Sequence, residues 1–386
     1  MRFVPYHSPV IRRVGVFLQE QILVVSLGVV AASLALTGRV SIARTPEIVD
    51  ADLLMVLFAL LVSVELLRES GLFERIVART LHRFTHSRPF VGAMVALSGA
   101  IAMLLTNDVA LFIVIPFTVL AGRLSRFDVR NAVILEIAAA NLLGCLTPLG
   151  NPQNLFLYHA AKWDAGHFVA TMLPFCLWSA LGLALAVRLL EKKVDIRRQP
   201  EASGPLHPLR ATAGAACFVL VVLEILRVIP AWPAATLAAV CLGLLLRHRL
   251  GEVDLSIVPL FFFAFIIVEG LRSFAVYRAI LELPFGDAGA RLYGAAILLS
   301  QAISNVPAAI LLEPLTEGRW TLLLYGVNAG GCGTIIASLA NLLGWRIFGR
   351  ESGDGAPGFV ARQTLISFAF LAWVAPGAWV IARMME

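Results

Sequence analysis

Small polar side chains that interrupt two apolar stretches are the residues that could do chemistry in this 386-residue chain. They are Thr106, Asn107 and Asp108 in the first half and Ser304 and Asn305 in the second. Amides and hydroxyls donate and accept hydrogen bonds, so they can hold a small solute or an ion, but they do not form the nucleophile and base pair of an enzyme. Asp108 carries the only charge at these points, which favours ion coordination or proton exchange. The alternative role of Asp108 is an N-cap for the helix that follows.

A second set of polar residues occurs in two segments that align without gaps. NLLGCLTPLGNPQNL at 141–155 matches NAGGCGTIIASLANL at 328–342 with a constant offset of 187, and Asn, Gly, Cys, Thr, Asn and Leu coincide. Polar residues at equal places in two segments indicate a duplication, although each could also join helices by hydrogen bonds. The candidate binding residues of these segments are Asn141, Thr147, Gly150, Asn151, Asn154, Asn328, Thr334, Ser338 and Asn341.

Proline and glycine should break the helix in the first of these segments. Pro148 and Pro152 lack the backbone donor, and Gly150 between them favours unwinding. A break frees backbone groups at membrane depth, where they are tolerated only if they line a cavity or bind something. Helix N-termini offer a partial positive charge to an anion, and free carbonyls offer a site for a cation.

The composition requires a lipid environment. Apolar residues make up 59% of the chain, charged residues make up 15%, and the mean hydropathy is +0.85, so there are too few ionisable groups to cover a water-soluble globule of this size. The net charge of +6 comes with arginines in short loops, which is typical of topology signals and not of nucleic-acid binding. No disulfide framework is expected, because the five cysteines lie in apolar segments: Cys145, Cys176, Cys217, Cys241 and Cys332.

Apolar runs that can span about 30 Å of hydrocarbon recur along the whole chain. We predict an all-α polytopic membrane protein with about nine spans, at 20–38, 52–68, 131–160, 167–189, 211–228, 232–247, 256–273, 320–345 and 361–383. The stretches 88–122 and 288–316 are divided by the polar tips into arms of about 12 to 17 residues. Arms of this length are marginal or too short to cross the bilayer, so each stretch is predicted to be a re-entrant helical hairpin.

The basic residues orient these elements. With the N-terminus in the cytoplasm, most arginines and lysines of the loops fall on the cytoplasmic side, as the positive-inside rule expects. With nine spans the two hairpins then enter from opposite faces, so the halves are predicted to be inverted repeats. The N-terminal repeat covers 1–190, a polar cytoplasmic linker covers 191–210, and the C-terminal repeat covers 211–386. Inverted repeats are characteristic of secondary transporters, whose site lies near the midplane.

Other ionisable residues have more than one reading. A Glu-x-x-Arg pair precedes each hairpin, at Glu65/Arg68 and at Glu269/Arg272. The glutamates Glu136, Glu224 and Glu313 fall inside apolar runs, where each could be a proton relay or could lie at a helix end. The histidines have no convincing metal-ligand spacing, and the hydrolase, metalloprotease and phosphate-loop motifs are missing from the sequence.

At these residues the chain resembles the ion transporter superfamily, in particular the branch with the divalent-anion/sodium symporters, citrate permeases and arsenite permease or sodium/proton antiporter relatives. The motifs that carry the resemblance are LTNDVALFIVIPF, GNPQNLFLY, SNVPAAILLEPL and GVNAGGCGTIIASLANLLG, within about 50–345. The first tip reads Thr-Asn-Asp, as in arsenite-permease-like members, and departs from the Ser-Asn-Thr pattern of the dicarboxylate symporters.

The resemblance implies paired inverted repeats, a transport domain that moves against a scaffold by an elevator type of alternating access, and commonly a homodimer. It implies that the tip residues Thr106, Asn107, Ser304 and Asn305 hold coupling cation and substrate, facing Thr147, Asn151, Thr334 and Ser338 on the broken helices. A sodium ion could lie near Asn107, Asp108, Asn151 and Asn305.

The leading hypothesis is a secondary active transporter in the bacterial inner membrane that moves a small anion, a carboxylate or an inorganic oxyanion, coupled to sodium or protons and without a cofactor. An arsenite/antimonite efflux permease or a sodium/proton antiporter is the nearest alternative. A passive channel and an intramembrane enzyme are the remote ones.

Overall fold

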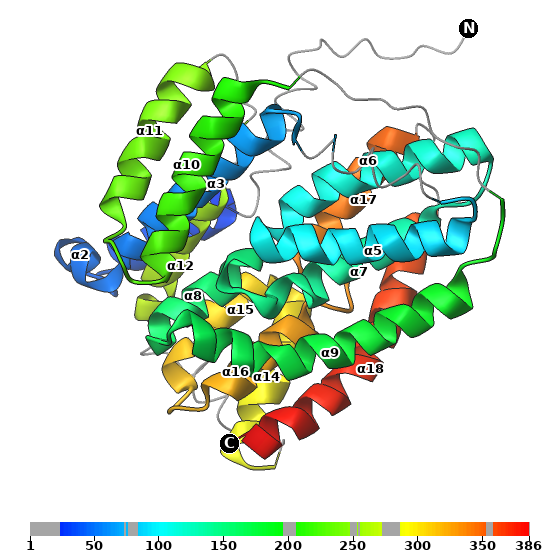
Figure 1. The fold of residues 1–386 in the computed structure, drawn as a ribbon. Coiled ribbons are helices and arrows are strands. Elements are labelled where there is room, and N and C mark those ends of the chain that lie inside the picture. Colours follow the sequence, from blue (N-terminus) through cyan, green and yellow to red (C-terminus); the bar gives the residue numbers. More distant parts are fainter. Residues whose placement is uncertain are drawn as a thin grey trace, which may run out of the picture.

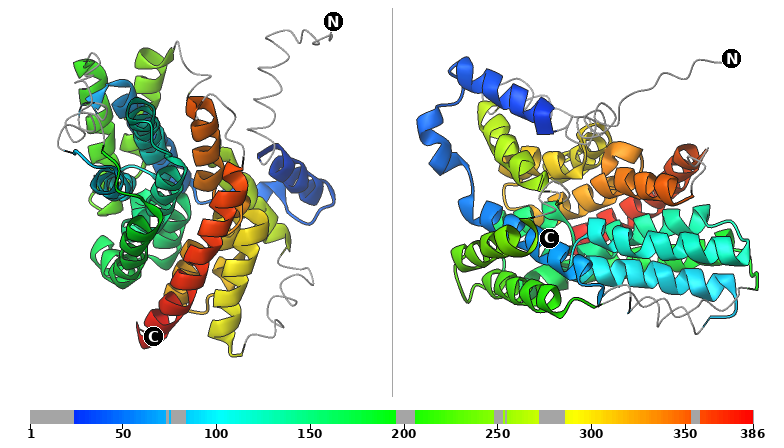
Figure 2. Two further views of the ribbon diagram at one scale, coloured as in Figure 1. Left: turned by 90° about the vertical axis from the view of Figure 1, so that its right-hand side faces the viewer. Right: turned by 90° about the horizontal axis from the view of Figure 1, so that it is seen from above.

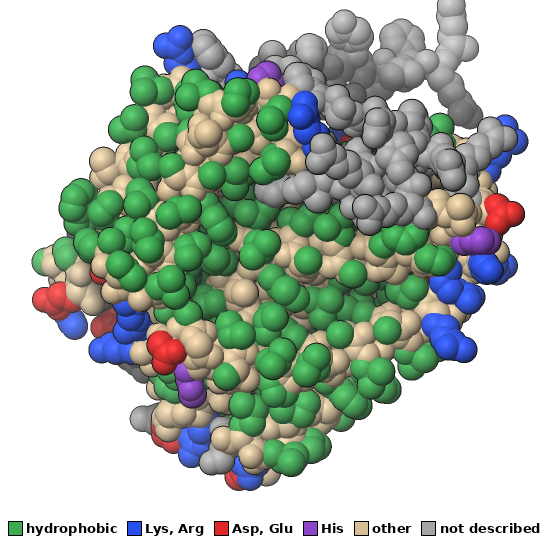
Figure 3. All heavy atoms as spheres, viewed as in Figure 1, with side chains coloured by type: hydrophobic (Ala, Val, Ile, Leu, Met, Phe, Trp, Pro, Cys, Tyr) green, Lys and Arg blue, Asp and Glu red, His purple; other side chains and the backbone are tan. Residues whose placement is uncertain are grey.

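The structure is a computed structural model that describes residues 24–72, 75, 84–195, 206–247, 253, 255–271, 286–352 and 358–385. Within these residues the regular structure is helical throughout. Five of the described helices are long and apolar enough to cross a membrane: α5 (Ser87–Leu104), α6 (Asn107–Ser125), α9 (Ala165–Leu190), α10 (Pro208–Ile225) and α18 (Phe359–Met385). Hydrophobic side chains cover the face in Figure 3, and charged side chains gather at its margins. The prediction of an all-α polytopic membrane protein is confirmed.

One group of helices packs around α3 (Ala51–Glu69). α10 and α11 (Trp232–Leu245) lie along it, at the upper left of Figure 1, and α12 (Ile257–Leu271) also contacts it. The helix Val24–Leu36 packs on α12, since a Cβ at Gly28 would lie 3.2 Å from the ring of Phe263. In Figure 2 this helix and α2 (Thr45–Ile48), which follows the short turn Ile42–Arg44, lie at the edge of the molecule. We call α3, α10, α11 and α12 the α3 group.

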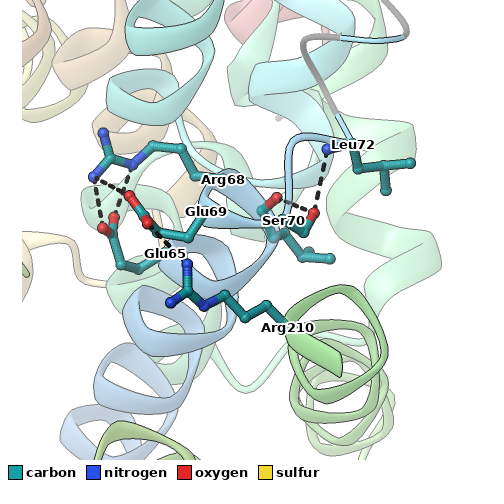
Figure 4. A network of polar contacts seen from close by, with 7 residues as sticks. Glu65, Arg68, Glu69, Ser70, Leu72 and Arg210 are labelled. Carbon is teal, nitrogen blue, oxygen red and sulfur yellow. Dashed lines mark hydrogen bonds and ion pairs between the residues drawn. The ribbon is translucent and has the colours of Figure 1, made fainter. Parts of the chain in front are cut away.

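An ion pair within α3 and another between the end of α3 and the start of α10 lie side by side (Figure 4). Arg68 Nη2 lies 2.5 Å from Glu65 Oε1, and Arg210 Nη1 lies 3.3 Å from Glu69 Oε2. The predicted pair Glu65/Arg68 is therefore an ion pair, whereas Arg272 of the second pair lies outside the described residues. Of the predicted linker 191–210, residues 191–195 and 206–210 are described, and α10 begins at Pro208.

The first hairpin and the first broken helix form a second group with α9. α5 and α6 pack together and meet at Thr106, and α7 (Arg130–Leu142), the turns Gly144–Leu146 and Pro148–Gly150, and α8 (Pro152–Ala161) follow. Both arms of the first hairpin are long and apolar enough to cross a membrane, so the prediction that they are marginal or too short to do so is wrong for this half. They are 18 and 19 residues long, longer than predicted. The reason is that α6 continues past its apolar run and stops at Arg126, whose φ of 57° ends the helix.

The second half of the chain places the same elements in the same order. α14 (Ala288–Ile303) and α15 (Asn305–Leu312) meet at Ser304, the turn Glu313–Leu315 follows, and α16 (Trp320–Gly330), the turn Ile335–Ala337 and α17 (Leu339–Ser352) lead to α18. α15 is short because Pro314 cannot continue the helix. In both halves the broken helix packs on its own hairpin, while α17 also packs on α6 and α8 on α15, so the two halves exchange contacts.

Candidate functional site

Both broken helices resume after a similar short segment, although the first break contains the additional 3-10 turn Gly144–Leu146. In each, two extended residues flank one short 3-10 turn. Thr147 (φ −115°, ψ 157°) and Asn151 (φ −141°, ψ 137°) flank the first turn. Thr334 (φ −67°, ψ 160°) and Ser338 (φ −145°, ψ 143°) flank the second, at the equivalent positions of the sequence repeat. The predicted breaks are confirmed.

Asn141, at the end of α7, is the centre of a buried polar network. Its Oδ1 accepts hydrogen bonds from Asn107 Nδ2 and Ser338 Oγ, each at 3.0 Å. Its Nδ2 donates to Asn341 Oδ1 at 3.0 Å, and its backbone carbonyl accepts from Asn151 Nδ2 at 3.2 Å. One side chain therefore connects the first hairpin tip to both broken helices.

Asn328, at the equivalent position of α16, is a second centre of the same network. Its Nδ2 donates to Asn154 Oδ1 at 2.7 Å. Its Oδ1 accepts from Asn151 Nδ2 at 3.3 Å and from Gln153 Nε2 at 3.2 Å. Gln153 was not predicted to be a site residue, although its position between Asn151 and Asn154 is a signal that could have found it.

The sequence repeat relates these bonds to one another. With the offset of 187, the bond from Asn141 to Asn341 corresponds to the bond from Asn328 to Asn154. In the same way, the bond from Ser338 to Asn141 corresponds to the bond from Asn151 to Asn328. Two segments that only resembled each other in sequence thus make matching hydrogen bonds in space.

Each broken helix also holds the hairpin of its own half. Thr147 Oγ1 donates to the carbonyl oxygen of Met103 on α5. Thr334 Oγ1 donates to the carbonyl oxygen of Gln301 on α14 at 3.1 Å. Met103 and Gln301 both lie four residues before the tip asparagine of their hairpin, so the two contacts are equivalent. Thr147 and Thr334 therefore position the hairpins and lie beside the network.

Gln301 is a further residue that sequence analysis missed. Its Nε2 donates to the carbonyl oxygens of Gly330 at 2.7 Å and Cys332 at 2.9 Å, and its Oε1 accepts from the N–H of Thr334 at 2.9 Å. It satisfies backbone groups that the break in the second helix frees. Gly333 permits this approach, because its φ is +119° and a Cβ there would overlap Gln301 Oε1. A glutamine in an apolar arm, one turn before the tip, is the signal for it.

Gly150 is required by a similar close approach in the first break. A Cβ at this position would overlap the carbonyl oxygen of Gly144 and would lie 2.9 Å from that of Ala102. Both obstacles are backbone atoms, which cannot rotate away as a side chain can. Gly150 therefore lets the 3-10 turn pack against α5, and it shapes the site without contributing a side chain.

The first hairpin tip joins the network through Asn107. Thr106 is extended and precedes the first residue of α6, which makes it the N-cap. The alternative role of Asp108 as the N-cap is therefore wrong, because Asp108 lies in the first turn of α6. Asp108 is linked to the network through its backbone N–H, which donates to Asn107 Oδ1 at 2.9 Å.

The second hairpin tip borders the network at Gly331. A Cβ at Gly331 would lie 3.1 Å from Asn305 Nδ2, and the Gly331 carbonyl accepts from Asn341 Nδ2 at 3.0 Å. Ser304, whose φ of 75° is in the left-handed region, donates from Oγ to Asn305 Oδ1 at 3.4 Å. Such a backbone conformation in a residue other than glycine is sparsely populated and is characteristic of functional sites.

The network is closed to solvent in this conformation, and none of its residues is more than 4% exposed. Its members are Asn107, Asn141, Asn151, Gln153, Asn154, Asn328, Ser338 and Asn341. Four helices begin at or beside these residues: α6, α8, α15 and α17. The first backbone N–H groups of each helix carry partial positive charge, so the arrangement favours a negatively charged ligand.

A cavity of about 190 Å³ is lined by α2 and the turn before it, by α12, by α8, and by α15 and the turn after it. Phe156 of α8 and Ile310 of α15 form part of its wall, and both helices begin at the network. Charged side chains also line the cavity: they are Glu313 and the ion pair in which Arg44 Nη1 lies 3.8 Å from Glu269 Oε1. The cavity is therefore partly lined by charged side chains and lies against α8 and α15.

The five cysteines are buried and free, as predicted. The Sγ atoms of Cys145 and Cys176 lie 3.6 Å apart in the core beside the first break. Glu136, one of the three glutamates in apolar runs, is fully buried in α7 and not at a helix end. Within the described residues no group of three or more histidine, cysteine or acidic side chains is arranged to hold a metal ion.

The chain is similar to known membrane proteins over most of its length. A family model described as citrate transporter matches residues 16–318, which include the first broken helix and both tips. An uncharacterized transporter of Methanocaldococcus jannaschii is 32% identical over 306 residues, covering 78% of this chain and 82% of that protein. The inner membrane protein YbiR of Escherichia coli is 30% identical over 302 residues, covering 78% and 81%. An uncharacterized transporter of Mycobacterium tuberculosis is 24% identical and covers 89% and 91%.

Proposed function

Because the chain belongs to the citrate transporter family, we propose that it is a secondary active transporter that moves a small anion, a carboxylate or an inorganic oxyanion, coupled to sodium or protons. The observation that carries the proposal is the start of four helices at one buried network of amides and hydroxyls. The family supports transport of anions through an integral membrane protein. The solute, the coupled ion and the mechanism are our proposal.

The chemistry of the network supports an anion that is bound without arginine. Neither broken helix carries a basic residue between Asn131 and Tyr158 or between Thr321 and Trp345. Amide groups, hydroxyls and helix N-termini must then supply the donors, and these hold an anion more weakly than a guanidinium does. A cation that binds with the solute would compensate for this weakness.

A buried oxygen is available for such a cation. Asn151 is 1% exposed, and among the described residues its Oδ1 has no hydrogen-bond partner. A buried polar atom of this kind calls for a ligand, and an amide oxygen suits sodium. We propose that a sodium ion would occupy the region of Asn151, Asn107 and Asn305. Asp108, which follows Asn107 in the sequence, would add a negative charge.

We further propose that the halves are inverted repeats whose hairpins are re-entrant, and that transport follows alternating access of an elevator type. The matching hydrogen bonds of the halves, and the exchange of contacts by α8 and α17, support this architecture. The α3 group would be the scaffold, and the hairpins and broken helices the transport domain. The arginine distribution favours a cytoplasmic N-terminus. Exposed apolar residues on α10 and α11, including Val219 and Leu244, would suit a homodimer.

The Thr-Asn-Asp sequence of the first tip favours one alternative, an arsenite efflux permease or a sodium/proton antiporter. The experiment that separates these functions is uptake by purified protein in proteoliposomes. The solutes are citrate, succinate, phosphate, sulfate and arsenite, each tested with and without a sodium gradient and a pH gradient.

We expect saturable, concentrative uptake of an anion, and we expect Asn107→Ala and Asn305→Ala to abolish it while the protein still purifies as a folded species. Flux that stays linear with concentration would instead indicate a channel. Exchange of sodium for protons with no anion flux would establish the antiporter.

A further inference from the structure

Glu136 is a carboxylate buried in the centre of the hairpin and broken-helix packing. Its Oε1 accepts a hydrogen bond from Thr118 Oγ1 of α6, and its backbone carbonyl accepts from Ser98 Oγ of α5 at 2.9 Å. Its Oε2 is also buried and has no hydrogen-bond partner among the described residues. From the sequence, Glu136 could be a proton relay or a helix-end residue, and the proposed function does not use it.

An ionised carboxylate in this position would be costly. The free-energy penalty for burying one ion exceeds what a single hydrogen bond to a charged group recovers. A bound proton removes the charge and leaves the bond from Thr118 to Oε1 in place. The geometry of Glu136 therefore fits the protonated acid in this conformation.

A second buried carboxylate lies at the first turn of α7, because Asn131 Nδ2 of that turn donates to the carbonyl of Leu190, the residue before Glu191, at 3.0 Å. Glu191 follows α9, is 5% exposed, and lies close enough for its charge to act on Glu136. Burial raises the pKa of Glu191 to about 7, and the charge of Asp128 acts in the same direction against Arg362 and Arg88. A group that titrates near neutral pH exchanges protons readily in both directions. Asp128, whose charge acts on Glu191, lies two residues before α7 and is about half exposed.

The other elements that pack on α7 bring little charge to Glu136. α5 and α6 present the hydroxyls of Ser98 and Thr118, and α17 presents Gly344 to the neighbouring Ile137. From α18, Arg362 acts on Glu191. Among the described residues, the charge that acts on Glu136 is that of Glu191.

We propose that Glu136 is a proton-binding site that exchanges its proton with water through Glu191, and that its protonation is coupled to solute binding at Asn141. Glu136 and Asn141 are five positions apart on α7, or about 7.5 Å along its axis. Proton binding converts the Glu136 carboxylate and a hydronium ion into a carboxylic acid and water, and proton release reverses this. The inference rests on the proposed function and deepens it by assigning a proton site to Glu136, apart from the region proposed for sodium.

Infrared spectroscopy of the purified protein tests the site without any solute. At neutral pH we expect the wild-type protein to show the carbonyl band of a protonated carboxylic acid. Glu136→Gln should remove this band, and Thr118→Val should shift its frequency, because the hydrogen bond to Oε1 is lost. The matched control is Glu65→Gln on α3, whose carboxylate is paired with Arg68, and it should leave the band in place. Glu191 also titrates near neutral pH and contributes to the band, so the comparison is made in protein that already carries Glu191→Gln. In that background, a spectrum without the band, or a band that Glu136→Gln leaves unchanged, overturns the proposal.

Transport of radiolabelled citrate, or of whichever tested solute the wild type accumulates, separates this inference from the function on which it rests. A pH difference of one unit should change the wild-type accumulation ratio about tenfold for each coupled proton. Glu136→Gln should still exchange internal for external solute, but its accumulation should no longer follow the pH gradient. If the variant follows the gradient as the wild type does, the proton site is refuted and the transporter function remains. If the wild type moves none of the tested solutes saturably, the proposed function itself fails.

Discussion

Replacing Asn141 by alanine should weaken solute binding while leaving the membrane fold intact. The side chain is 3% exposed and makes three hydrogen bonds of 3.0 Å, to Asn107, Ser338 and Asn341. Alanine leaves two donors and one acceptor without this partner. Hydrogen bonds between membrane helices average about 0.6 kcal/mol and reach about 1.7 kcal/mol, so three of them amount to roughly 2 to 5 kcal/mol. These bonds hold the starts of α6 and α17 in the arrangement that binds the solute. Losing about 2 kcal/mol of the stability of that arrangement lowers the apparent solute affinity about 30-fold.

The assay is a thermal-shift titration of the purified variant with the transported solute, followed by initial uptake rates in proteoliposomes. Asn131→Ala is the matched control, since Asn131 lies at the other end of α7 and donates a single bond to the Leu190 carbonyl at 3.0 Å. Its solute affinity should stay within about twofold of the wild type. Asn328→Ala should reproduce the loss, because Asn328 is the second centre of the network. Wild-type affinity in Asn141→Ala, or an equal loss in the control, would refute the reasoning.

Three further predictions concern the packing and the charges around the site. Gly150→Ala should destabilise the protein by about 1 to 3 kcal/mol, because the new Cβ overlaps the Gly144 carbonyl, whereas Gly243→Ala, with open space around it, should not; thermal denaturation compares the two. Glu191 has a folded-state pKa of about 7 against an ordinary value of 4.5, so its contribution to stability is greatest below about pH 4.5 and is lost as the pH rises to about 7. Glu191→Gln should therefore flatten the pH dependence of the melting temperature in this window, and an unchanged profile would contradict the assignment. Tyr158→Phe removes the hydrogen bond from α8 to the Ile225 carbonyl of α10, and should lower the free energy of unfolding by about 1 kcal/mol. If α8 moves against α10 during transport, the variant should also show a higher initial rate of solute uptake. Tyr293→Phe, which loses a 2.8 Å bond to Ala375 between α14 and α18, should lower stability without that change in rate.

The sequence alone determined the fold class, the positions of the long helices α9 and α18, and the breaks. The nine spans stay a prediction, because five described helices are long and apolar enough to cross a membrane and two of these, α5 and α6, were predicted to be hairpin arms. A chain in a bilayer must satisfy its backbone hydrogen bonds within each segment, so apolar length specifies where helices run, and proline, glycine and polar residues specify where they stop. For this reason the predicted spans 167–189 and 361–383 lie within α9 and α18. The breaks after α7 and α16 follow from the same local information. The repeat was also readable, because its asparagines and threonine keep their spacing in both halves.

Only the tertiary structure decided which polar groups meet. Asn141 and Asn341 are 200 positions apart, and their bond depends on how α17 packs against α6 and α7. Gln301 looks like an isolated polar residue in an apolar arm until the break in the second helix places free carbonyls against it. Glu136 likewise becomes a buried acid with one hydroxyl donor only when α6 brings Thr118 to it. Helix formation is local and is encoded by neighbouring residues, whereas the partners of buried amides and carboxylates are fixed by the packing of segments far apart in the chain, which hydropathy and spacing do not encode.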